Sequence, residues 1–122
     1  MSYTNPMGHY VTLVPSTETY ADATARTTAV DTTYSTEGVF MLEVAQASYG
    51  DEHIDVNIQT YDPLTDDWYT IASFTQIEDA TTAQREVIRI PYGLGNKISC
   101  NWVITDGDDA HVYTITVSGI LK

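Results

Sequence analysis

The chain has 122 residues, the usual size of one domain, and 43% of them are hydrophobic, as in an ordinary globular protein. Seventeen acidic residues against five basic ones give a formal net charge of −12, a surface that repels nucleic-acid phosphates. No apolar stretch approaches the ~20 residues of a membrane span, and the first residues do not resemble a secretory leader. We therefore expect no nucleic-acid partner, no membrane span and folding in a cytoplasm.

The first part of the chain predicts an arm followed by a strand. Residues 1–8 are polar and contain Pro6 and Gly8, which is typical of an extended arm. Residues 9–15 predict a first strand closed by Pro15, and residues 16–23 predict a polar link. We thus expect an arm and first strand over residues 1–22 and a β-sandwich domain over residues 23–122, within one domain overall.

The central part of the chain predicts three further strands. Residues 24–31, rich in Thr and Ala, predict a weak strand at a sheet edge or against a partner. Residues 39–47 predict a stronger strand with two distinct faces. Residues 53–61 alternate most clearly, with one apolar face (Ile54, Val56, Ile58) and one expected to face water (His53, Asp55, Asn57, Gln59).

The second half of the chain predicts a hairpin and three more strands. Residues 62–67 have the Asp-Pro chemistry of a turn, and residues 68–74 return as its second strand. Residues 76–84 are polar and predict a loop. Residues 85–91, 97–105 and 110–121 predict strands, with Cys100 and Trp102 on an apolar face.

These segments indicate an all-β protein with an antiparallel β-sandwich and an extended N-terminal arm. Short strands separated by turns at regular spacing are typical of such folds. A jelly-roll and an immunoglobulin-like arrangement both fit, because periodicity does not determine the order of strands in a sheet.

Residues that could support catalysis or metal binding form no recognisable motif. His9, His53 and His111 lie apart in sequence, and the only cysteine, Cys100, is expected to be a buried apolar residue. Asp106, Asp108 and Asp109 could form a calcium loop or a solvated turn, and their spacing favours the turn. We expect no catalytic residue, no metal and no cofactor.

Four motifs resemble those of small all-β virion proteins of tailed bacteriophages, the group that includes capsid decoration (cement) proteins. They are ARTT at residues 25–28, IQTYDPLTDDWY at 58–69, IPYG at 90–93, and NWV at 101–103 with YTITV at 113–117. The resemblance covers residues 23–121, and residues 1–22 fall outside it. It implies no catalytic residues and a role in binding and stabilising the major capsid protein on the capsid exterior.

The expected function is therefore structural, with residues 1–15 as an arm that reaches a neighbouring subunit. A homo-oligomer is a further expectation, with a trimer fitting the threefold sites of a capsid lattice. A head–tail or tail-associated role is one alternative, and a carbohydrate-binding module that stacks sugars on Tyr61, Trp68 and Tyr69 is another. The residues expected at a protein interface are Tyr3, Pro6, Tyr10, Leu13, Arg26, Tyr61, Trp68 and Tyr69.

Overall fold

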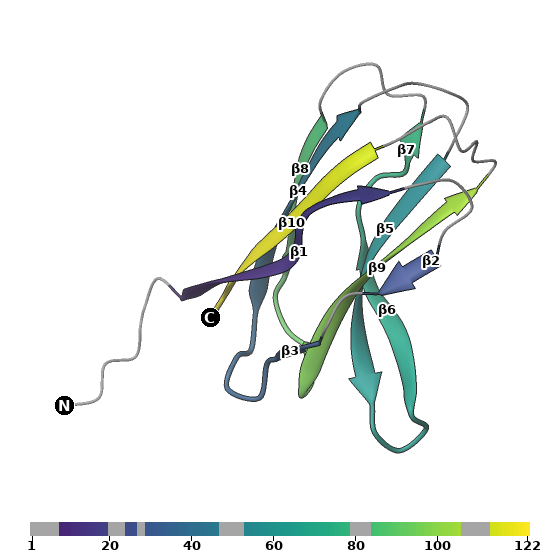
Figure 1. Cartoon of the computed structure of the whole chain (residues 1–122). Coiled ribbons are helices and arrows are strands. Elements are labelled where there is room, and N and C mark those ends of the chain that lie inside the picture. The colour runs from purple at the N-terminus through teal and green to yellow at the C-terminus, as the bar shows by residue number, and fades with distance from the viewer. Residues whose placement is uncertain (1–7, 20–23, 27–28, 47–52, 79–83, 106–112) are drawn as a thin grey trace.

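The computed structural model describes residues 8–19, 24–26, 29–46, 53–78, 84–105 and 113–122. Over these residues the protein is all-β, and its strands form two antiparallel sheets that face each other as a sandwich (Figure 1). The predicted fold class is confirmed.

Each sheet has four strands in its main path. Sheet A has the order β1 (His9–Thr19), β10 (Tyr113–Leu121), β4 (Gly38–Gln46) and β8 (Gln84–Ile90). Sheet B has the order β2 (Thr24–Arg26), β9 (Lys97–Thr105), β5 (His53–Asp62) and β6 (Asp67–Ser73). Two short strands extend sheet B, because β3 (Val30–Asp31) pairs with β9 and β7 (Ile77–Glu78) pairs with β5.

The strand order is that of a jelly roll. Successive strands lie on opposite sheets, apart from the β5–β6 hairpin and the short steps β2–β3 and β6–β7 within sheet B. An immunoglobulin-like sandwich would instead place several successive strands beside each other in one sheet. Of the two arrangements left open by the sequence, the structure has the jelly roll.

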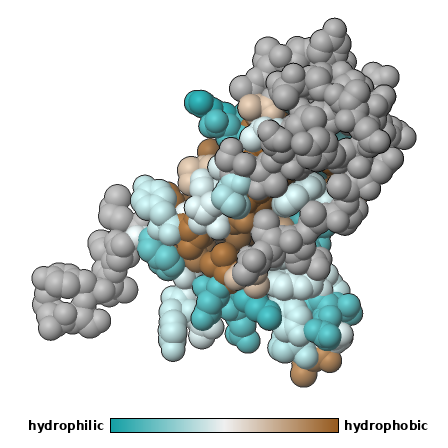
Figure 2. All heavy atoms as spheres, in the orientation of Figure 1, coloured by the Kyte–Doolittle hydropathy of each residue, from teal (hydrophilic) through white to brown (hydrophobic). Residues whose placement is uncertain are grey.

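The core lies between the two sheets and follows the predicted alternation. Phe40, Leu42 and Val44 of β4 face Ile54, Val56 and Ile58 of β5, and Cys100 and Trp102 of β9 are buried as expected. Figure 2 shows hydrophobic residues gathered in the middle of the visible face, between β1 and β9, with hydrophilic residues around the lower end.

The first strand is longer than predicted and belongs to the sandwich. β1 continues past Pro15 to Thr19 and pairs with β10 along its length. Pro15 is tolerated because β1 lies at the edge of sheet A and its register shifts on either side of Val14. The sandwich therefore begins at His9, and the expectation of a free arm over residues 1–15 is corrected for residues 9–15.

Two further details of sheet B differ from the sequence-based expectation. Residues 76–84 were expected to be loop, but Ile77 pairs with Ile54 and is buried in the core. Gln59 was expected to face water, yet it is buried, and its amide Nε2 donates to the Thr70 hydroxyl at 3.1 Å. The register of the β5–β6 pairing shifts between Ile58 and Gln59, and these two consecutive residues are both buried.

Candidate interaction surface

Three loops lie at one end of the sandwich. They are residues 32–37 between β3 and β4, residues 63–66 between β5 and β6, and residues 91–96 between β8 and β9. All three lie at the lower end of the molecule in Figure 1. We call these three loops the loop end.

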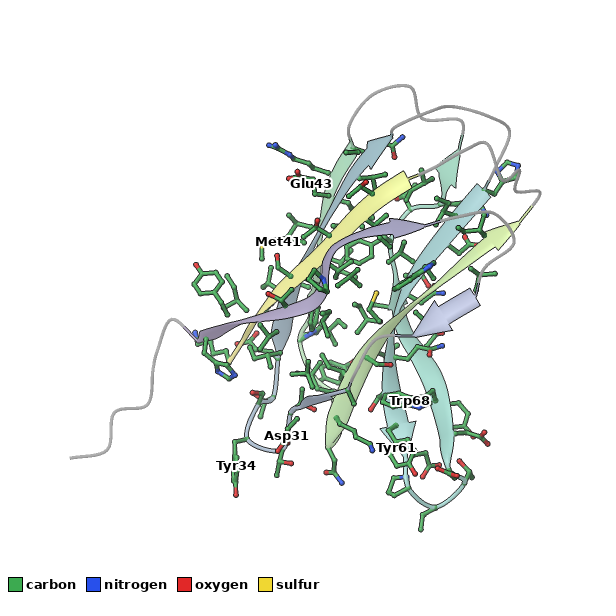
Figure 3. The ribbon with its side chains drawn as sticks, in the orientation of Figure 1. Asp31, Tyr34, Met41, Glu43, Tyr61 and Trp68 are labelled. Carbon is green, nitrogen blue, oxygen red and sulfur yellow. The ribbon has the colours of Figure 1, made fainter. Side chains whose placement is uncertain are left out.

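Each loop of the loop end exposes one large apolar side chain. Tyr34 is 98% exposed, Leu64 is 94% exposed and Tyr92 is 79% exposed. Figure 3 shows Tyr34 pointing away from the body of the protein, at the same end as the hairpin that carries Tyr61 and Trp68. Side chains of this kind add little to the stability of the isolated chain, so their contact area is available to a partner.

The loops beneath these side chains are tied to each other and to the core. The backbone N–H and the hydroxyl of Thr32 donate to the carbonyls of Asn96 and Gly95, each at 2.8 Å, and the Thr60 hydroxyl donates to the Leu94 carbonyl at 2.8 Å. Leu94 is buried. Gly95 has φ +72°, and a Cβ there would lie 2.5 Å from the Thr60 hydroxyl, so this approach requires glycine. Hydrogen bonds therefore join the loop that carries Tyr34 to the loop that carries Tyr92.

The hairpin turn is held by its own aspartates. The Asp62 carboxylate accepts from the Leu64 N–H at 2.9 Å and from the Thr65 hydroxyl at 3.1 Å. Asp66 has φ +58°, a left-handed conformation that Asp tolerates better than most residues. The Tyr61 hydroxyl donates to Asp66 at 2.5 Å, and this bond to the neutral phenol raises the pKa of Tyr61.

The rings of Tyr61 and Trp68 pack against each other and against the ammonium group of Lys97. Their ring centroids are 5.2 Å apart with an angle of 57° between the planes, and the Lys97 ammonium lies 4.1 Å from the Tyr61 centroid and 5.9 Å from that of Trp68. Both aromatic rings are half-buried. Because the rings are tilted and a cation already covers one of them, the cluster is no flat platform for a sugar ring.

The other residues predicted for an interface are not gathered at the loop end. Tyr10 is exposed on the outer face of sheet A, and Tyr69 on β6 is half exposed. Leu13 is only 3% exposed, so its prediction as an interface residue is corrected: its side chain packs in the core. Tyr3, Pro6 and the side chain of Arg26 lie outside the described residues.

Sequence reasoning missed Tyr34 and Tyr92. Both lie in short polar or glycine-containing connections, where a large aromatic side chain has no strand face to join. That placement is the one local signal for their exposure. Their position at the same end of the molecule depends on the strand order, which the sequence pattern did not reveal.

The described residues give little support for reactive chemistry. His9 and His53 lie on different sheets, and no group of three His, Cys, Asp or Glu residues in the described ranges could hold a metal ion. Burial raises the pKa of the Cys100 thiol to about 12, so the reactive thiolate is scarce near neutral pH. The loop with Asp106, Asp108 and Asp109, and His111 after it, lie outside the described residues.

Comparison with known proteins adds no family assignment. No protein-family model matches the chain, and no curated protein matches its sequence. In the described part of the chain, no helix is long and apolar enough to cross a membrane.

Proposed function

We propose that this chain is a structural virion protein of a tailed phage, a capsid decoration protein that binds the major capsid protein on the outside of the shell. The virion assignment is supported by the sequence resemblance over residues 23–121. The jelly roll is compatible with it, because viral capsid domains are among the proteins that use this fold. A fold of this kind also serves lectins and cupins, so the choice between functions depends on the surface.

The loop end is the observation that carries the proposal. It presents three exposed apolar side chains, Tyr34, Leu64 and Tyr92. Part-buried hydrogen bonds hold the loops of Tyr34 and Tyr92, and bonds to the Asp62 carboxylate hold the turn of Leu64. A surface that is ordered before binding loses little conformational entropy when it docks, and apolar anchors supply most of the binding energy at protein interfaces. Such a surface fits apolar hollows on another folded protein.

Charge around the loop end indicates the character of that partner. Asp31, Asp62, Asp66 and Asp67 lie in or beside the three loops, while Lys97 is engaged with the Tyr61 and Trp68 rings. An acidic rim around apolar anchors favours a partner surface with basic residues around its hollows. The remaining negative charge of the chain is then best placed away from packaged DNA, on the shell exterior.

A carbohydrate-binding role is less well supported. That alternative relied on Tyr61, Trp68 and Tyr69 as a stacking platform, but Tyr61 and Trp68 are tilted at 57° and Lys97 lies over the Tyr61 ring. A sugar would have to displace the lysine and would still meet only one ring face at a time. The proposal therefore stays with a protein partner.

Binding to assembled shells tests the proposal. The chain would be co-expressed with the major capsid protein encoded by the same genome, and shells would be purified and imaged by electron microscopy. We expect regular occupancy on the outer surface. Combined Tyr34→Ser, Leu64→Ser and Tyr92→Ser substitutions should reduce occupancy at least about tenfold, because they remove the apolar anchors.

A matched control separates the loop end from other surfaces. Tyr69→Ser removes a half-exposed aromatic side chain from β6, outside the loop end, and should leave shell occupancy nearly unchanged. Full occupancy by the triple variant would contradict the loop-end assignment. Absence of the wild-type chain from shells, with binding to connectors or tails of the same phage, would instead favour the head–tail or tail-associated alternative.

A further inference from the structure

The outer face of sheet A carries an apolar patch that spans all four strands. Strand pairing places Tyr10, Ile120 and Val39 in one row across β1, β10 and β4. The next row places Met41 of β4 beside Val87 of β8. We call these five residues the sheet A patch.

The sheet A patch is accessible in the single chain. Tyr10 is 79% exposed and Val87 is 64% exposed, and the three residues between them are partly exposed. Figure 3 shows Met41 and Glu43 on the side of sheet A that faces away from sheet B. A shallow hollow lies between Met41, Val87 and Ser118. Contiguous apolar residues on an outer sheet face are typical of a surface that another protein covers.

Among the described residues, the charged side chains beside the sheet A patch form two ion pairs. At one end Arg85 pairs with Glu43 at 3.3 Å, and at the other end Arg89 pairs with Glu37 at 2.9 Å. These two pairs contain two of the five basic residues of the chain and two of its seventeen acids. Removing them leaves fifteen acids and three bases, so the whole net charge of −12 resides in the other residues.

We propose that the sheet A patch binds the same patch of a second copy of this chain. Two copies that each carry −12 repel through most of their surfaces, so a locally neutral apolar face is where they approach at least electrostatic cost. A two-fold axis running across the strands, between the two rows, brings Val39 of one copy against Met41 of the other and so places apolar residues in contact.

Contact through the face is favoured over contact through the β1 edge of sheet A. Pro15 and two register shifts interrupt the exposed edge strand β1. A proline and bulges are devices that prevent another strand from adding to a sheet edge. The side chains of the outer face carry no such obstruction.

The size of the face sets the expected strength of the contact. Four strands at about 4.8 Å spacing and roughly 3.3 Å per residue make it about 19 Å wide and, over the seven residues of β8, about 23 Å long. This footprint is smaller than the roughly 800 Å² that a standard interface removes from each partner. We therefore expect a dimer with a dissociation constant on the order of micromolar.

Sedimentation equilibrium of the purified full chain tests this inference, which is independent of the proposed function. Between about 1 and 500 µM, a range that brackets a micromolar constant, the wild type should pass from monomer to dimer. Val87→Glu should raise the dissociation constant at least tenfold, because it buries an additional negative charge in the contact between two acidic chains. Met41→Glu serves as a second variant in case one substitution disturbs folding, which circular dichroism would show.

Leu64→Glu is the matched control, because it adds the same charge at an exposed apolar position on the loop end. It should leave the dimer intact. The inference is overturned if the wild type stays monomeric over the whole range, or if Leu64→Glu dissociates the dimer while Val87→Glu and Met41→Glu do not. It is also overturned if the wild type forms an oligomer that none of the three substitutions affects.

Discussion

At the scale of single residues, tight packing surrounds Phe40, whose ring is fully buried between the sheets. Two glycines leave room for the ring: Gly38 on the same strand and Gly119 directly opposite on β10. A Cβ at Gly119 would lie 2.8 Å from Cδ1 and 3.0 Å from Cε1 of Phe40. Neither glycine has a positive φ, so the reason for glycine here is the approach of the ring.

Gly119→Ala should therefore destabilise the fold by about 1–3 kcal/mol, the usual cost of overpacking a core that cannot shift. Urea unfolding followed by tryptophan fluorescence measures the change. Ser118→Ala, one residue earlier and on the outer face of the same strand, is the control and should stay within about 0.5 kcal/mol of wild type. Equal midpoints for Gly119→Ala and wild type would show that the Phe40 ring moves without cost.

At the scale of elements, strands were predictable where apolar and polar residues alternate along the strand itself. They were missed where pairing with another strand determines whether a segment is extended. The pattern of residues 53–61 identified β5 from its own sequence. The end of β1 was missed because an edge position accepts Pro15, and β7 was missed because Ile77 is a single apolar residue without periodicity. The loop end was not foreseen, since it depends on pairings between strands far apart in sequence, such as β4 with β8 and β5 with β9.

The β5–β6 hairpin was predicted from its Asp-Pro turn, and its geometry suggests a test at Asp66. Asp66→Val should destabilise the protein by about 1–2 kcal/mol, because a β-branched residue is strained at φ +58°. Asp66→Gly loses the same bond from the Tyr61 hydroxyl but has no such strain, so it should cost less. Thermal unfolding compares the two variants, and equal losses would mean that the lost hydrogen bond, not the backbone, determines the effect.

At the scale of the whole molecule, the dominant feature is an excess of negative charge that ion pairs do little to offset. The two described surface pairs, Arg85–Glu43 and Arg89–Glu37, involve exposed or partly exposed side chains, and such pairs contribute little to stability. The folded state brings acids closer together than the unfolded chain does, so self-repulsion opposes folding. A partner that neutralises the acidic surface would relieve this repulsion, which connects the charge to binding at the loop end.

Salt should therefore stabilise the isolated protein at neutral pH. The Debye screening length falls from about 30 Å at 0.01 M to about 10 Å at 0.1 M ionic strength. The added salt therefore weakens repulsion between separate acids more than attraction within a close ion pair. Raising NaCl from about 10 to 300 mM at pH 7.5 should raise the melting temperature by several degrees, since about 1 kcal/mol corresponds to roughly 3–6 °C for a domain of this size. Near the isoelectric point of about 4.2 the net charge vanishes, and the same salt increase should have little effect on the melting temperature.

Calorimetry at a protein concentration below the dissociation constant of the proposed dimer separates screening within one chain from association of two chains. A melting temperature that falls with salt at pH 7.5 would mean that attractive pairs, rather than the net charge, dominate the electrostatics of the fold.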